Sequence, residues 1–257
     1  MKENSESQES LVRQLFGKKS QEYSTSSLLA DERNLALLLK LAEITKNDRI
    51  LDIATGTGFL AVAISNTGAE LIATDFTMAM LEKAKVALGN QNNTVLALAD
   101  AARMPFAAES FDVVTCRIAV HHFTEPETAF AEMARVCKQG GRVMIMDVIS
   151  SEDQQEGDLQ NRITKLRDIS EVRQWKRSEL EGMLRSSGLI VSHSELWPHI
   201  MAFDEWIRLG GADAETTKTI REMIIDSMEG DKAAMSPQIM DDKMFFTWNT
   251  AIIVARK

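Results

Sequence analysis

The hydrophobic positions between residues 49 and 148 form short apolar runs separated by stretches with helical spacing. The runs are rich in β-branched residues and read RILDIA, ELIATD, TVLALAD, FDVVTCRI and RVMIMDV. Apolar residues at intervals of three and four predict helices over 60–65, 78–88 and 127–137. Because strands that alternate with helices are typical of βαβ units, we expect a parallel sheet with helices on both faces.

Capping signals bound the helix expected over 127–137. Thr124 and Glu127 have the spacing of a capping box, and Pro126 suits a first helical turn. The pair Gly140-Gly141 is expected to stop this helix.

The flanking segments extend the pattern without a repeat or a low-complexity linker. We expect a helix over 28–44, a helix over 177–188 with a capping box of Ser178 and Glu181, and irregular helices over 204–240. A strand over 189–197, ended by Pro198, and a final strand over 245–257 complete the prediction. One domain over 1–257 is the simplest organisation.

Composition narrows the class of protein. The chain has 257 residues, of which 44% are hydrophobic and 26% charged, and it contains no apolar run long enough to cross a bilayer. Its N-terminus is polar and lacks the pattern of a secretory signal, so we expect a frayed N-terminal tail and a cytoplasmic protein. A formal net charge of −9 argues against a nucleic-acid partner, and the basic segment 162–177 is expected to be a solvated helix face.

The two cysteines, Cys116 and Cys137, lie inside apolar patterns. Neither has the spacing of a metal-binding motif, so buried thiols and no metal site are expected.

The segment LDIATGTGFLA combines a strand with a glycine turn. Gly56, Gly58 and Ala61 match the pattern G-x-G-x-x-A of dinucleotide-binding turns. Such a turn lets ligand atoms approach backbone amides at a helix N-terminus, which suits several ligands. The glycine spacing therefore leaves a nicotinamide cofactor open.

Three carboxylates at successive strand ends favour a different ligand. Asp75 follows Gly56 by 19 residues, a spacing that suits hydrogen bonds to ribose hydroxyls in either cofactor class. Asp52 lies four residues before Gly56, where its charge favours an ammonium or sulfonium over a pyrophosphate. Asp100 ends the third strand and could accept from an adenine amine, so the three acids indicate a cationic adenosine ligand.

With these residues in place, the sequence resembles the class I S-adenosylmethionine-dependent methyltransferases, in particular the small-molecule group that includes the ubiquinone/menaquinone-biosynthesis methyltransferases. The matching motifs, in order, are LDIATGTG, ATDFTMAML, ALADAARMPF, FDVVTCRIAVHHF and AEMARVCKQGGRVMIMDV, and SELEGMLRSSGL extends the match. One departure is Phe59, where many members of the family have a third glycine.

The resemblance implies a Rossmann-like α/β fold with seven strands, mostly parallel, and a final antiparallel strand. Residues 1–27 would be a flexible tail and lid, 28–148 the cofactor-binding core, and 149–257 a C-terminal part whose helical insertions cover the substrate. It also implies that S-adenosylmethionine is the cofactor. The residues expected to contact this cofactor are Tyr23, Asp52, Ala54, Gly56, Gly58, Asp75, Phe76, Met80, Asp100, Ala101 and Arg117.

Within that set, the resemblance gives each group a role. Asp52 would lie near the ammonium, and Asp75 would hold both ribose hydroxyls. Phe76 and Met80 would enclose the adenine, although packing in the core is the alternative for both. The carbonyl of Arg117 would face the ammonium.

The doublet His121-His122 follows the fourth strand, at the edge of the sheet where open α/β folds bind ligands. An imidazole there could take a proton from a methyl acceptor, while an inward, structural orientation is the alternative for one of the two.

Three hypotheses follow from these residues. The first is methyl transfer to N, O or C of a small, partly apolar metabolite by a monomer or homodimer. The second is an NAD(P)-dependent oxidoreductase, and the third is a noncatalytic protein that binds S-adenosylmethionine.

Overall fold

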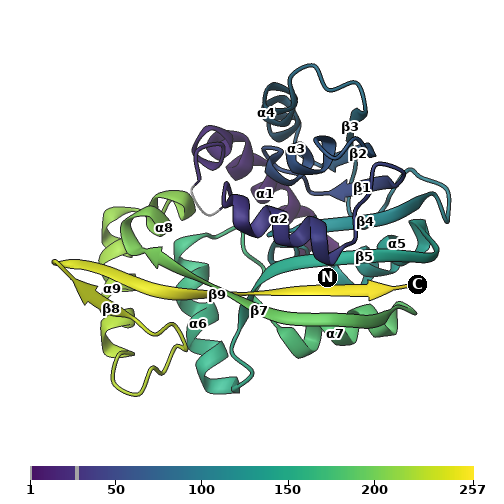
Figure 1. The fold of residues 1–257 in the computed structure, drawn as a ribbon. Coiled ribbons are helices and arrows are strands. Elements are labelled where there is room, and N and C mark those ends of the chain that lie inside the picture. Colours follow the sequence, from purple (N-terminus) through teal and green to yellow (C-terminus); the bar gives the residue numbers. More distant parts are fainter. Residues whose placement is uncertain (1, 27–28) are drawn as a thin grey trace.

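A twisted sheet runs through the computed structural model, which describes residues 2–26 and 29–257 (Figure 1). Nine strands of the described residues form it, and seven of them follow one path in the order β3-β2-β1-β4-β5-β9-β7. The strands are β1 (Arg49–Ile53), β2 (Glu70–Asp75), β3 (Thr94–Leu98), β4 (Phe111–Arg117), β5 (Cys137–Ser150), β6 (Trp175–Lys176), β7 (Ile190–Ala202), β8 (Gln238–Met240) and β9 (Lys243–Arg256).

The first five strands are parallel, as the alternating pattern predicts. The chain moves outward from β1 to β2 and β3 and then returns to place β4 on the other side of β1. The carboxyl ends of β1 and β4 therefore flank the point where the strand order reverses, which is where open α/β sheets bind ligands.

The last strand, β9, is antiparallel to both of its neighbours, β5 and β7. This confirms the predicted final antiparallel strand in a Rossmann-like sheet, and β6 and β8 add short pairings beside β5 and β9. The predicted end of a strand at Pro198 is wrong, because β7 continues to Ala202. A proline is tolerated there because β7 is the last strand of the path, so one of its edges needs no hydrogen bonds.

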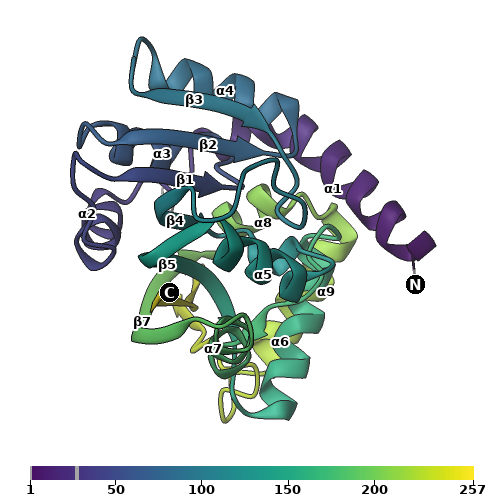
Figure 2. The ribbon, with the colours of Figure 1, turned by 90° about the vertical axis from the view of Figure 1, so that its right-hand side faces the viewer.

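Helices cover both faces of the sheet (Figure 2). Leu35, Leu38 and Ile64, from α2 and α3, pack on one face. On the other face, Phe130 and Leu184, from α5 and α7, pack on the opposite side chains of β1, β4 and β5. The helical elements are α1 (Lys2–Tyr23), α2 (Glu32–Leu41), α3 (Phe59–Ser65), α4 (Met78–Leu88), the 3₁₀ turn η1 (Val120–His122), α5 (Pro126–Val136), α6 (Gln154–Arg167), α7 (Arg177–Ser186), α8 (Phe203–Gly210) and α9 (Ala214–Asp226).

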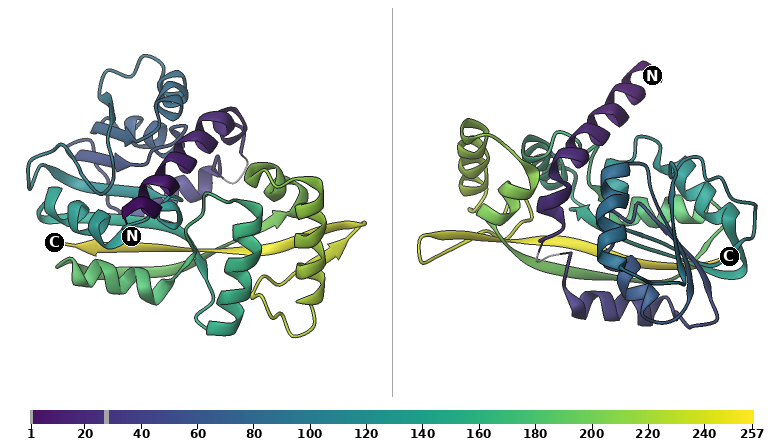
Figure 3. Two further views of the ribbon diagram at one scale, coloured as in Figure 1. Left: turned by 180° about the vertical axis from the view of Figure 1, so that it is seen from behind. Right: turned by 90° about the horizontal axis from the view of Figure 1, so that it is seen from above.

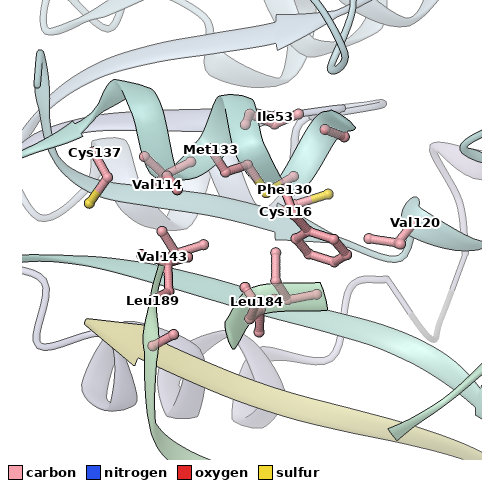
Figure 4. Close-up of a cluster of buried hydrophobic side chains, with 14 of the residues drawn as sticks. Ile53, Val114, Cys116, Val120, Phe130, Met133, Cys137, Val143, Leu184 and Leu189 are labelled. Atoms are coloured by element: carbon pink, nitrogen blue, oxygen red, sulfur yellow. The ribbon is translucent and has the colours of Figure 1, made fainter. Parts of the chain in front are cut away.

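Both cysteines belong to the core beneath α5 and α7 (Figure 4). Cys116 lies on β4 beside Phe130 of α5, and Cys137 begins β5. Both are free thiols with no exposed surface, as the apolar pattern around them predicts.

The expected stop of α5 at Gly140-Gly141 is wrong, because the helix ends at Val136 and β5 begins at the next residue. Gly141 is required for another reason. A Cβ there would lie 2.7 Å from the Cys137 sulfur and 2.9 Å from the Asp112 carbonyl, where the β4–β5 register is irregular. The capping box from Thr124 is also not formed, since Glu125 is the N-cap and Pro126 the first helical residue.

The expected N-terminal tail is a helix instead. In α1, Val12 is only 3% exposed, and the helix packs against α4 and α8. Its first turns extend away from the rest of the molecule (Figures 2 and 3). The helix expected over 28–44 is shorter, because Asp31 caps α2 by accepting hydrogen bonds from the first backbone amides. Leu28, with Met1 and Ser27, lies outside the described residues.

Two further expectations for the C-terminal part are wrong. Ser178 and Glu181 do not form a capping box, since Ser178 donates to Glu152 and Glu181 binds Arg185. The basic segment 162–177 is not a wholly solvated face either. Arg167, at its centre, is 3% exposed and pairs with buried Glu171 at 3.1 Å.

A third apolar cluster lies between α6, α8, α9 and one end of β9. In Figure 1, these elements lie beyond the parallel strands. The cluster includes Trp206, Phe246 and three of the methionines between residues 201 and 244. In the part of the chain that the structure describes, no helix is long and apolar enough to cross a membrane.

Candidate functional site

A cavity of about 610 Å³ opens at the carboxyl ends of β1, β2 and β4, and α1 closes one side of it. Of the residues predicted for the site, only Gly58 and His121 do not line it. The others are Tyr23, Asp52, Ala54, Gly56, Asp75, Phe76, Met80, Asp100, Ala101, Arg117 and His122. The lining residues all lie between Val12 and Ala129, so the C-terminal helices expected to cover a substrate contribute none of them.

The turn after β1 has the left-handed backbone that its glycines permit. Gly56 has φ +58°, and Ala54 adopts φ +53°, a rare value for a residue with a side chain. The backbone amide of Gly56 donates a hydrogen bond of 3.0 Å to Asp75. A Cβ at Gly56 would meet nothing within 4 Å, so this part of the turn is open to a ligand.

Gly58 serves the packing of two helices rather than the cavity wall. It is the N-cap of α3 with φ +94°, and a Cβ there would lie 3.0 Å from the Ala84 Cα of α4. A side chain at residue 58 would therefore push α3 and α4 apart.

Asp52 is a buried carboxylate, 1% exposed, in the floor of the cavity. It accepts hydrogen bonds of 2.6 Å from the hydroxyls of Thr55 and Thr115. Burial raises its pKa to about 6, although these two hydrogen bonds and the charge of Arg117 oppose the rise. The anionic form therefore gains from a cation placed nearby.

Asp75 ends β2 and is 6% exposed. Its two oxygens accept from the backbone amides of Gly56, at 3.0 Å, and Thr77, at 2.8 Å. Burial raises its pKa to about 6 despite these two hydrogen bonds. The carboxylate thus links the ends of two strands and still has lone pairs that can accept from a ligand.

Asp100 and Met80 lie at the far side of the cavity. Asp100 is exposed and accepts a hydrogen bond of 2.9 Å from the Ala102 amide, which shapes the turn after β3. Met80 is 3% exposed on α4, and Phe76 is half-buried at the start of the same segment. Two apolar side chains and a carboxylate therefore share this wall.

Arg117 brings a cation into the cavity, where the sequence indicated only a backbone role. Its guanidinium donates a hydrogen bond of 3.0 Å to the Leu29 carbonyl and thereby ties the N-terminal segment to the end of β4. Burial lowers the pKa of Arg117 to about 10, while Asp52 and Asp31 oppose the shift, so the side chain is charged at neutral pH. Opposite charges of Arg117 and Asp52 thus lie in one cavity wall.

Aromatic rings from α1 close the cavity above the sheet. The rings of Phe16 and Tyr23 are 5.4 Å apart, and Phe16 meets the His122 ring edge-on at 4.9 Å. Burial raises the pKa of Tyr23, so its hydroxyl stays protonated.

His121 points away from the cavity and is 3% exposed. Its Nδ1 lies 2.6 Å from the carboxylate of Asp147, which also accepts from the backbone amides of Ala119 and Val120. Burial lowers the pKa of His121, but the charge and hydrogen bond of Asp147 outweigh burial and raise it overall. His121 therefore stabilises the η1 turn. It is the member of the doublet that has the inward, structural orientation, the alternative given for one of the two histidines from the sequence.

His122 lines the cavity from the other side of the same turn. Its ring lies 4.0 Å from the His121 ring, and its Nδ1 is 3.3 Å from the Ser170 hydroxyl. Burial and then the nearby charge of His121 lower its pKa to about 3, so the imidazole is neutral at physiological pH.

Three of these residues were not foreseen from the sequence. Asp147 is the one acid within the apolar run RVMIMDV, and a carboxylate inside a buried strand is a signal that could have singled it out. Phe16 and Ser170 carried no such signal, because their place beside His122 depends on contacts distant in sequence. Among residues 2–26 and 29–257, no group of three His, Cys, Asp or Glu side chains could hold a metal ion.

Comparison with known proteins identifies the family. Residues 51–145 match the model of a methyltransferase domain. The uncharacterized methyltransferase YcgJ of Bacillus subtilis is 34% identical over 207 residues, which is 80% of this chain and 82% of YcgJ. The chain belongs to the class I S-adenosylmethionine-dependent methyltransferases.

Solved structures support the assignment of this methyltransferase to the family. The YcgJ structure superposes with a TM-score of 0.82 at 30% identity, covering 88% of this chain and 98% of that one. A phosphoethanolamine N-methyltransferase of Haemonchus contortus, solved with S-adenosyl-L-methionine, shares the fold at 20% identity and a TM-score of 0.59, over 88% of this chain and 52% of that one.

A demethylmenaquinone methyltransferase of Clavibacter sepedonicus is 38% identical over 100 residues, or 39% of this methyltransferase and 41% of that enzyme. The shared part is therefore less than half of either chain. Membership in a methyltransferase family decides against the nicotinamide oxidoreductase that the glycine turn left open.

Proposed function

We propose that this protein binds S-adenosylmethionine in the cavity beneath α1 and transfers its methyl group to a small, partly apolar metabolite. The observation that carries the proposal is the pair of buried carboxylates, Asp52 and Asp75, at neighbouring strand ends in one cavity wall. The related enzyme solved with this cofactor shares the fold.

The cavity has the size and chemistry that this cofactor requires. About 610 Å³ lies within the range of small-molecule sites. The Thr57 hydroxyl in its wall is buried without a hydrogen-bond partner among the described residues, which indicates a place for a polar ligand atom. A ligand that carries an ammonium and a sulfonium would stabilise the ionised form of Asp52.

We assign the binding roles by charge and position. Asp52 would face the ammonium of the cofactor's amino acid group, and the guanidinium of Arg117 is placed to bind the carboxylate of the same group. The open backbone of Ala54 and Gly56 would lie against the chain that joins this group to the nucleoside.

The nucleoside would occupy the opposite end of the cavity. Asp75 would accept hydrogen bonds from two ribose hydroxyls, with its orientation fixed by two backbone amides. Phe76 and Met80 would enclose the adenine, and Asp100 with the backbone of Ala101 would contact its amino edge.

The bound cofactor supplies an electrophilic methyl group on a positively charged sulfur. The protein's own contribution is to orient the acceptor and to exclude water, effects that reach about 7–11 kcal/mol in favourable intramolecular reactions. Phe16 and Tyr23 would cover the acceptor side, and the neutral His122 is the candidate proton acceptor there. His121, which is paired with Asp147, would act only by holding this turn.

Calorimetry with three ligands tests the proposal. S-adenosylmethionine and S-adenosylhomocysteine should both bind, and reduced nicotinamide dinucleotide should not. Incubation of the protein with methyl-labelled S-adenosylmethionine and a metabolite extract should then yield a labelled product. Tight cofactor binding without any labelled product would favour the noncatalytic binder, and nicotinamide binding alone would contradict the proposal.

A further inference from the structure

One ring nitrogen of His122, Nδ1, has a partner outside the cavity. This nitrogen is 3.3 Å from the hydroxyl of Ser170, which lies on the segment that follows α6. No residue of 168–174 lines the cavity, so Nδ1 is turned away from it. Because His122 itself lines the cavity, the opposite edge of the ring, with Nε2, is the part that a ligand can reach.

The Ser170 hydroxyl is held in one orientation by Asp168. A single carboxylate oxygen, Oδ1 of Asp168, accepts from both the backbone amide of Ser170, at 2.9 Å, and its hydroxyl, at 2.5 Å. Both residues are almost fully buried, with exposures of 2% for Asp168 and 1% for Ser170. The serine side chain therefore has a fixed rotamer behind the His122 ring.

The direction of these hydrogen bonds follows from counting protons. Burial raises the pKa of Asp168, but the nearby charge of Arg167, together with the charge of Lys19 and the hydrogen bond of Ser170, outweighs burial and brings the pKa down to about 2, so this carboxylate can only accept hydrogen bonds. The one hydroxyl proton of Ser170 is thus donated to Asp168. The serine oxygen has only lone pairs left for His122, and Nδ1 must carry the proton in their contact.

We infer that Asp168 and Ser170 are positioning residues that keep the proton of neutral His122 on Nδ1 and so present Nε2 as an acceptor to the methyl acceptor. This inference rests on the proposed function in one respect, namely that the group bound at Nε2 is a methyl acceptor. Neither Asp168 nor Ser170 lines the cavity, so both act through the His122 ring.

The role implies a balanced proton transfer. The proton of the acceptor atom passes to the lone pair of Nε2, and the electron pair of the broken bond to hydrogen remains on the acceptor atom as that atom binds the methyl carbon. The electron pair of the broken carbon–sulfur bond stays on sulfur. His122 then carries a proton on each nitrogen and releases the one on Nε2 to water. The acceptor must therefore bear a hydrogen on the N, O or C atom that is methylated.

Nitrogen NMR of the histidine rings tests the inference without an acceptor. In the ¹⁵N-labelled protein at pH 7, His122 should show a protonated Nδ1 and an unprotonated Nε2. Ser170→Ala removes the hydrogen-bond acceptor of Nδ1 and should lower the ratio of the Nδ1–H to the Nε2–H tautomer by threefold to tenfold or more, about the worth of one hydrogen bond. Ser170→Thr, which keeps a hydroxyl, should restore the native ratio.

A control and a binding measurement separate this role from the proposed function. Ser187→Ala removes a hydroxyl that donates to the Met183 carbonyl and should not change the His122 tautomer. Ser170→Ala should leave the affinity for S-adenosylhomocysteine within about twofold of the native value, since Ser170 does not line the cavity.

The tautomer of His122 in the unsubstituted protein tests the inference by itself, whether or not a variant folds. A neutral His122 protonated on Nε2, or a doubly protonated ring at pH 7, would overturn the inference, as would an unchanged tautomer ratio in folded Ser170→Ala. Failure of the native protein to bind S-adenosylhomocysteine would contradict the proposed function and leave the tautomer result intact.

Discussion

The backbone amide of Gly56 donates a hydrogen bond of 3.0 Å to the carboxylate of Asp75, so the glycine turn after β1 is tied to the end of β2. The second oxygen of Asp75 accepts from Thr77 at 2.8 Å, which leaves the carboxylate with a single orientation toward the cavity. A hydrogen-bond acceptor that is already oriented loses little entropy when a ligand binds.

Replacement of Asp75 should therefore weaken cofactor binding strongly. In Asp75→Ala, two hydroxyls of the proposed ribose lose a charged acceptor, and the affinity for S-adenosylhomocysteine should fall by about 1.5–3 kcal/mol, roughly 10- to 150-fold. Calorimetry measures the loss, and Asp158→Ala on the exposed face of α6 is the matched control. An unchanged affinity in Asp75→Ala would show that the ribose binds elsewhere.

Protonation of the two cavity acids should make binding depend on pH. Burial raises the pKa of Asp52 and of Asp75 to about 6, so both are ionised at pH 8 and increasingly protonated below pH 6. The affinity for S-adenosylmethionine should be constant from pH 8 to 7 and then fall, by up to about tenfold per pH unit for each carboxylate that must ionise. Asp52→Asn should reduce this pH dependence, and an affinity that rises on acidification would contradict the assignment.

The stability of the unliganded protein should change in the opposite direction. A carboxylate whose pKa is higher in the folded state stabilises the fold below its unfolded pKa of 3.8, and this contribution is lost as pH rises through about 6. Asp52→Asn should therefore lose less free energy of unfolding than the native protein between pH 5 and pH 7. Urea unfolding at the two pH values measures the difference. Equal losses in both proteins would show that the pKa of Asp52 is not raised in the folded state.

Two glycines of one turn should differ in their tolerance of alanine. Gly58→Ala combines φ +94° with a Cβ 3.0 Å from the Ala84 backbone, and we expect a loss of about 2–4 kcal/mol in the free energy of unfolding. Gly56→Ala has backbone strain alone, and about 1–2 kcal/mol should be lost. Urea denaturation ranks the two variants, and the reverse order would mean that α3 and α4 can move apart.

The buried pair of His121 and Asp147 should stabilise the η1 turn most strongly at low pH. Because the pKa of His121 is raised in the folded state, its contribution is complete below the unfolded value of 6.5 and is lost as pH rises through the higher folded value. Asp147→Ala removes the partner of a buried charge and should cost about 3–5 kcal/mol at pH 6. The loss should be smaller at pH 9, and an equal loss at both values would show that the histidine is not charged.

The parts of the fold that could be predicted are those in which apolar residues recur at a regular spacing over a short stretch of chain. The parallel strands and their terminal acids, Asp52 and Asp75, follow from apolar runs that each end at a turn. The end of α5 was misplaced because Gly141 permits a close approach of β4 and β5, which the local pattern does not reveal.

The acceptor side of the site depends on contacts between distant segments. His122 and Ser170 are 48 residues apart, and α1 has a polar sequence from which the apolar side chains of Val12 and Phe16 line the cavity. Neither relationship produces a periodic pattern, so the histidine doublet could be noticed in the sequence while the different surroundings of its two members could not.

The position of β9 has a consequence for biosynthesis. This strand, residues 243–256, lies between β5 and β7 rather than at an edge, so a growing polypeptide can make both neighbours long before the strand that joins them. Until it emerges from the ribosome, the apolar residues that pair across β5 and β9, Met144 with Val254 and Met146 with Ile252, are separated. The chain should therefore depend on chaperones until β9 has left the ribosome.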